Sequence, residues 1–81
     1  MLSGRHPEEQ PLFEVIWLRG QASVETESIN LPRVEQAIAR ARGKFSDVRR
    51  RHPGNEPDAF RVLAPTGEEL AYRPFKEAPD A

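Results

Sequence analysis

The chain has 81 residues, enough for one small domain with a marginal hydrophobic core. Its 12 basic and 13 acidic side chains give a net charge of −1, a balance typical of neither a strongly cationic nucleic-acid binder nor a disordered polyanion. Because there is no cysteine, the sequence excludes disulfide bonds, thiolate metal centres and a thiol nucleophile. The longest apolar run, Val15 to Leu18, is too short for a membrane span or a signal peptide, so we expect a cytoplasmic protein that does not engage a membrane.

The sequence predicts a single folded domain over residues 12–75. Residues 1–11 contain one glycine and two prolines without apolar periodicity, which is typical of a mobile arm. Residues 76–81 are mostly polar or small and include a further proline, so we expect a flexible tail.

Residues 12–19 predict a β-strand because they are rich in aromatic and β-branched side chains and are followed by Gly20. Both faces of this strand are apolar, which indicates that both need cover. The first face consists of Phe13, Val15 and Trp17, and the second of Leu12, Ile16 and Leu18. Only Glu14 interrupts the second face.

Residues 21–28 are polar, and their side-chain types alternate along the chain, which favours a short edge strand that returns from a turn at Gly20. Val24, Thr26 and Ser28 share one side of it, and Glu25 and Glu27 share the other. We interpret the two glutamates as charges that discourage pairing of this edge with another sheet.

Residues 31–51 predict a long amphipathic helix. Asn30 is a favourable N-cap, and Pro32 falls in the first turn, where its missing N–H costs nothing. Pro53 requires the helix to end by residue 52. The apolar side chains recur at helical spacing and form one stripe: Val34, Ile38, Ala41, Phe45 and Val48.

Residues 59–73 predict a β-hairpin around Pro65-Thr66-Gly67, with Gly67 in a left-handed conformation. A regular register from this turn pairs Ala64 with Glu68, Val62 with Leu70 and Phe60 with Tyr72. That pairing would place all the large apolar side chains of the hairpin on one face.

These elements predict an α+β domain: a small antiparallel sheet of three to four strands with one long helix on one face, in the order β-β-α-β-β. The helix stripe, the hairpin and the face of Phe13, Val15 and Trp17 would form the core. Four apolar residues would remain on the uncovered face of the sheet: Leu12, Ile16, Leu18 and Leu63. An apolar patch of this kind indicates an interface, and we expect it to bind a second copy of the chain or another protein.

Residues with catalytic potential are few. The two histidines are His6, in the expected arm, and His52, at the end of the helix. Glu56 and Asp58 lie near enough in sequence to His52 to complete a weak metal site, but the more common role of a histidine there is to complement the helix dipole. With no phosphate-binding glycine loop and no nucleophile motif, we expect a non-enzymatic protein with no metal and no cofactor.

Charge is unevenly distributed, since residues 33–51 carry seven basic and two acidic side chains while the whole chain is slightly negative. The candidate anion or nucleic-acid contacts are Arg42, Arg49, Arg50 and Arg51. Nucleic-acid binding through this helix is the alternative function, although the pI of about 6.1 is lower than such domains usually have.

The chain resembles a group of short bacterial proteins of unknown function that share a strand, an acidic connection, a helix opening with Leu-Pro-x-x-Glu and a closing hairpin. The matching segments are residues 13–15, 31–37 and 60–63, followed by Thr66 and Gly67. The excess of arginine over lysine fits a GC-rich bacterial genome. The resemblance implies the fold and carries no activity and no site. We therefore expect a protein-interaction module, homodimeric through the open face of its sheet.

Overall fold

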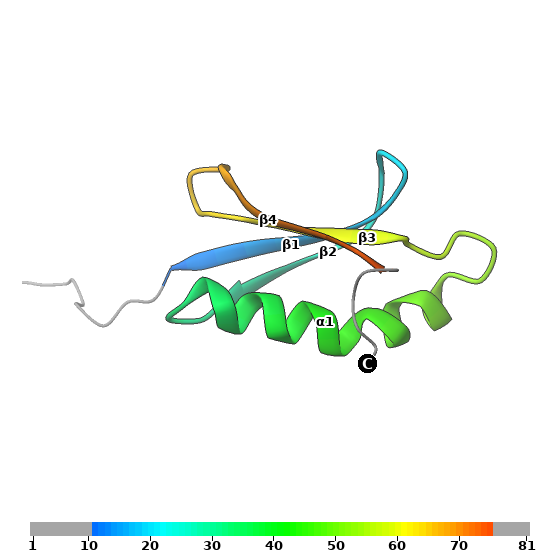
Figure 1. Ribbon diagram of the computed structural model, residues 1–81, viewed down its shortest axis with the longest axis horizontal. Helices are drawn as coiled ribbons and strands as arrows, with labels where there is room; N and C mark the ends of the chain where they lie inside the picture. The colour runs from blue at the N-terminus through cyan, green and yellow to red at the C-terminus, as the bar shows by residue number, and fades with distance from the viewer. Residues whose placement is uncertain (1–10, 76–81) are drawn as a thin grey trace, which may run out of the picture.

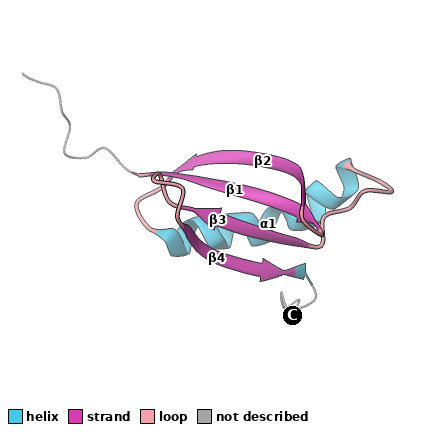
Figure 2. Cartoon of the chain, turned by 90° about the horizontal axis from the view of Figure 1, so that it is seen from above, coloured by secondary structure: helices cyan, strands magenta, loops and turns pink. Residues whose placement is uncertain are grey.

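The structure is a computed structural model that describes residues 11–75. It is an α+β domain in which one helix packs on one face of a four-stranded antiparallel sheet, as the sequence predicts (Figure 1). The elements are β1 (Leu12–Arg19), β2 (Ala22–Asn30), α1 (Val34–Arg51), β3 (Ala59–Leu63) and β4 (Glu69–Pro74). The strand order is β2-β1-β3-β4, so β2 and β4 form the two edges (Figure 2). The expected arm, apart from Pro11, and the expected tail lie outside the described residues.

The core lies between α1 and the two central strands. The predicted inner face of β1 is confirmed, because Phe13, Val15 and Trp17 are all buried. The helix stripe is confirmed at Ala41, Phe45 and Val48, which are buried, and Val34 and Ile38 pack partly buried at its margin. The remaining buried positions come from neighbouring elements: Ile29, Ala37, Phe60, Val62 and Ala71.

The helix begins later than the sequence indicates. Asn30 is the last residue of β2 and not an N-cap, and α1 starts at Val34 after an extended Arg33. The reason is that Asn30 pairs with Leu12 and lengthens β2. The helix end was predicted correctly, since α1 stops at Arg51 with His52 as its C-cap.

The predicted hairpin is right at its turn and wrong along its strands. Gly67 has a φ of +95°, and the Ala64 N–H donates to the Glu68 carbonyl, as expected. The register then shifts, because Leu63 pairs with Glu69 but Val62 pairs with Ala71, which leaves Leu70 as the extra residue of a β-bulge.

The bulge turns Leu70 and Tyr72 away from the core. Ala71 is buried against the helix side, so its two neighbours point to the opposite face and are 40% and 45% exposed. Phe75, which follows β4, packs its ring on Phe45 at a centroid distance of 4.8 Å. This part of the core therefore receives Phe75 in place of Tyr72.

Both hairpin turns bend away from the helix, so the β1–β2 turn and the β3–β4 turn rise at opposite ends of the uncovered face (Figure 1). The uncovered face is thus flanked by two raised turns. Within residues 11–75, no helix combines the length and the apolar character that crossing a membrane requires.

Candidate functional site

The open face, defined here as the side of the sheet opposite α1, is arranged in rows by cross-strand pairing. Glu14 of β1 pairs with Leu63 of β3. In the next row Ile16 pairs with Arg61, which in turn pairs with Tyr72 of β4. The exposed or half-buried apolar side chains of this face are Leu12, Ile16, Leu63, Leu70 and Tyr72.

Three of the four predicted interface residues lie on the open face with accessible side chains. Leu12 is 50% exposed, and Ile16 and Leu63 are half-buried. Leu18 is the exception. Its side chain is only 5% exposed, so the domain itself already covers it and a partner could not contact it. It lies next to the register shift between β1 and β2, close to the turn that rises over this end of the face. We therefore remove Leu18 from the interface and add Leu70 and Tyr72.

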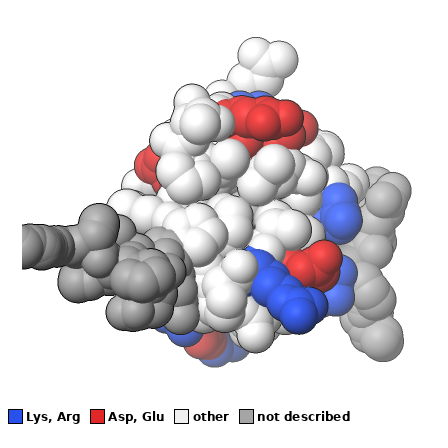
Figure 3. Space-filling view, turned by 90° about the vertical axis from the view of Figure 1, so that its left-hand side faces the viewer, with Lys and Arg blue, Asp and Glu red and all other residues white. Residues whose placement is uncertain are grey.

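Polar side chains lie among these apolar side chains: Glu14 stands between Leu12 and Ile16 along β1, and Arg61 stands between Ile16 and Tyr72 across the sheet. Arg61 Nε lies 3.3 Å from Glu69 Oε1, so the one guanidinium in the row of Ile16 and Tyr72 has an ion-pair partner on the same face. A hollow lined by Leu12, Glu14, Ser28, Ala64, Pro65 and Gly67 lies toward the β3–β4 turn. Seen from this end, the largest acidic group lies on the sheet side and most basic atoms lie toward the helix (Figure 3). Apolar side chains mixed with a few polar groups are common in protein interfaces.

A second charged region lies between β2 and α1, and we call it the β2–α1 seam. Glu27 Oε1 accepts from Lys44 Nζ at 2.9 Å, and Glu27 Oε2 accepts from Arg40 Nη2 at 3.0 Å. Glu25 Oε2 accepts from Arg51 Nη2 at 2.6 Å. The two glutamates thus face the helix, where they join the edge strand to it, and their charges are neutralised by this pairing.

The seam lowers the pKa of both carboxyl groups. For Glu25 the hydrogen bond from Arg51 is the largest effect, and it outweighs the opposing effect of burial. For Glu27 burial is the largest single effect and would raise the pKa, but the hydrogen bonds from Lys44 and Arg40 together lower it. The folded state therefore favours the ionised form of both groups.

Because these folded-state pKa values lie below the value of 4.5 for an unperturbed glutamate, the stability they confer is present above that pH and is lost as the pH falls through the folded-state values. We expect Glu27→Gln to lower the unfolding free energy by about 0.5–1.5 kcal/mol at neutral pH. The difference from wild type should shrink below pH 4.5. Thermal melts across this range measure it, with Glu68→Gln in the β3–β4 turn as control. A difference that stays constant with pH would contradict the assignment.

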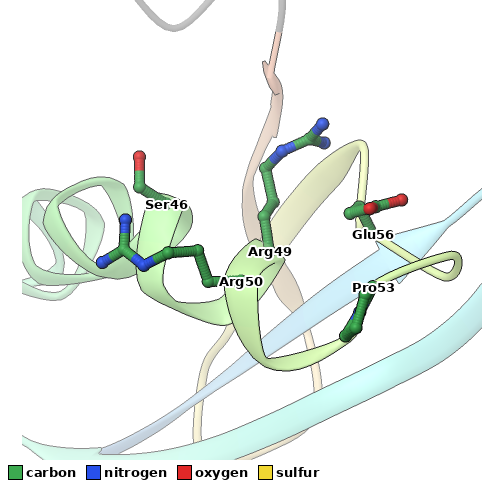
Figure 4. Close-up of a pocket in the computed structure, with 5 residues that line it drawn as sticks. All are labelled: Ser46, Arg49, Arg50, Pro53 and Glu56. Atoms are coloured by element: carbon green, nitrogen blue, oxygen red, sulfur yellow. The ribbon is translucent and has the colours of Figure 1, made fainter.

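The predicted anion contacts do not converge. Arg51 is bound to Glu25, Arg50 pairs with Asp47, and Arg49 donates to the Pro57 carbonyl and stacks on the Phe75 ring. The hollow beside them is lined by Ser46, Arg49, Arg50, Pro53 and Glu56, and the two guanidinium groups point apart there (Figure 4). Arg42 is exposed, with no ion pair within residues 11–75. This arrangement does not favour the nucleic-acid alternative.

The histidine at the end of α1 belongs to the seam. His52 Nε2 lies 2.9 Å from Glu25 Oε1, and neither Glu56 nor Asp58 is its partner. Glu56 instead accepts from the Gly54 N–H, and Asp58 from the Gly20 N–H. Among the described residues no group of three or more metal-binding side chains is present, and His6 lies outside them.

Comparison with known proteins gives no relative: no family model, no curated protein and no solved structure matches the chain. The resemblance to short bacterial proteins therefore stays a prediction.

Proposed function

We propose that this chain is a non-enzymatic protein-interaction module that binds a second copy of itself through the open face of its sheet. The observation that carries the proposal is the set of apolar side chains on the open face that α1 does not cover: Leu12, Ile16, Leu63, Leu70 and Tyr72. A group of apolar side chains that a small domain leaves uncovered usually marks an interface. A two-fold dimer would bury this surface in both copies, because the same patch serves each subunit.

The bulge in β4 supports this proposal. A regular hairpin would have placed Leu70 and Tyr72 on the helix side, whereas with the bulge both lie on the same face of the sheet as Ile16 and Leu63. Tyrosine is among the residues enriched at protein interfaces, since its ring buries a large area while its hydroxyl can form a hydrogen bond.

Sedimentation at micromolar concentration tests the proposal. The wild-type chain should run at twice the 9.2 kDa of one copy. Ile16→Glu should give a folded monomer, because the new carboxylate would be desolvated at the centre of the interface. Gln36→Glu on the exposed side of α1 adds the same charge and should leave the dimer intact. A wild-type chain that stays at 9.2 kDa would rule out the homodimer.

A further inference from the structure

The two edges of the sheet differ in how their free backbone groups are covered. At β4 the Tyr72 carbonyl accepts a hydrogen bond from Arg73 Nη1 at 3.0 Å, and Pro74 has no N–H to offer. Proline and charged side chains on an edge strand are known to discourage its pairing. β4 is also the shorter edge strand, with six residues against nine in β2. The β4 edge is therefore less suited to an added strand than the β2 edge.

The β2 edge is open, because Glu25 and Glu27, interpreted from the sequence as charges that discourage pairing of this edge, bind cations of α1 instead. The Asp58 N–H donates to the Leu18 carbonyl, so Leu18 directs its backbone groups toward β3, and by alternation Ile16 and Glu14 do the same. Their partners on β2 are Thr26 and Ser28, which must direct their N–H and C=O groups outward. Within residues 11–75 no strand pairs with this side of β2 (Figure 2).

Charge along this edge favours an acidic partner. Apart from His52, the seam contains three cations, Arg40, Lys44 and Arg51, against two carboxylates, and the neighbouring Asp47 is paired with Arg50. The glutamate side chains are mostly covered, at 24% exposure, while the side chains of Arg40 and Arg51 are about half exposed. The excess positive charge therefore reaches the solvent beside the edge, on the helix side of the sheet.

We propose that the β2 edge binds an extended acidic segment of another protein by strand addition. The backbone of this segment bonds to Thr26 and Ser28 and extends the sheet by one strand. Every second side chain of an added strand points to the helix side, where aspartate or glutamate would pair with the free donors of Arg40 and Arg51. The other side chains lie beside Thr26 and Ser28, where small polar residues fit.

A synthetic peptide in which glutamate alternates with threonine tests this proposal. It has nine residues, the same length as β2. Binding is measured by calorimetric titration, and amide hydrogen exchange at Thr26 and Ser28 should slow when the peptide is bound. Two further peptides carry N-methyl groups, one on every glutamate and one on every threonine. Strand addition predicts that only one of the two loses binding, since only alternate N–H groups face β2. A peptide with lysine in place of glutamate should not bind.

Variants of the protein complete the test. Thr26→Pro removes one outward N–H without touching the β1–β2 ladder, and it should weaken binding by about tenfold. Arg40→Gln combined with Arg51→Gln removes the two cations that would pair with the peptide, and it should weaken binding by a similar factor, about tenfold, and reduce its salt dependence. The N-methyl peptides decide the matter if Thr26→Pro fails to fold.

Two results would overturn the proposal. Equal binding of both N-methyl peptides would mean that charge alone holds the peptide. The second result is a wild-type dimer that dissociates with Thr26→Pro but stays intact with Ile16→Glu. It would mean that a second copy of the chain occupies this edge. A monomeric wild type that binds the alternating peptide would refute the homodimer and leave strand addition standing.

Discussion

Phe45→Ala should lower the free energy of unfolding by about 3–5 kcal/mol, enough to unfold much of a domain this small. Phe45 is 2% exposed and lies where the helix meets the sheet. Its ring packs edge-on against Phe60 at a centroid distance of 5.5 Å and against Phe75 at 4.8 Å. Truncation would remove both contacts and leave a cavity that the fixed backbone cannot fill. Urea denaturation followed by circular dichroism measures the loss.

The matched control is Phe75→Ala, because Phe75 contacts the same ring but is 39% exposed. Its truncation should cost less than half as much. If the two variants melted within a degree or two of each other and of wild type, the helix would not pack on the sheet through Phe45.

The parts of the fold that could be predicted from the sequence depend on local periodicity. The inner face of β1 and the helix stripe follow from alternation and from helical spacing, and both point to buried residues that the structure confirms. Gly67 was predictable for a similar local reason, since the turn requires a positive φ.

The β4 register was not predictable from local pattern. A regular pairing from the turn places Leu70 and Tyr72 on the inner face, and that pattern is as apolar as the one observed. The difference is a single extra residue, and the choice depends on long-range packing of Ala71 under the helix and of Phe75 on Phe45. No signal in residues 59–73 alone specifies that choice.

The seam was partly visible in the sequence. Glu25 and Glu27 share one side of their strand, and Arg40, Lys44 and Arg51 are spaced by four and seven residues, which places them along one flank of a helix. These two observations predict that the glutamates face the three cations only if β2 lies beneath that flank of the helix. The order β2-β1-β3-β4 puts it there, and that order comes from the tertiary structure.

Val15→Glu should unfold the chain, in contrast to the change at its neighbour Ile16. Val15 has no exposed surface and pairs with Val62 on one side and with Glu27 on the other. A carboxylate at this position would be buried under the helix and lose its hydration, which is costly. We expect a loss of about 4 kcal/mol or more, which approaches the whole stability of a small domain.

The comparison of residues 15 and 16 separates folding from association. Both substitutions add the same side chain to β1 one residue apart, and the pleat sends one to the core and the other to the open face. Val15→Glu should lack the dispersed amide signals of a folded protein in a proton NMR spectrum. A Val15→Glu chain that keeps those signals, or an Ile16→Glu chain that loses them, would show that the two faces of β1 have been exchanged, and the interface would then have to be sought on the opposite side of the sheet.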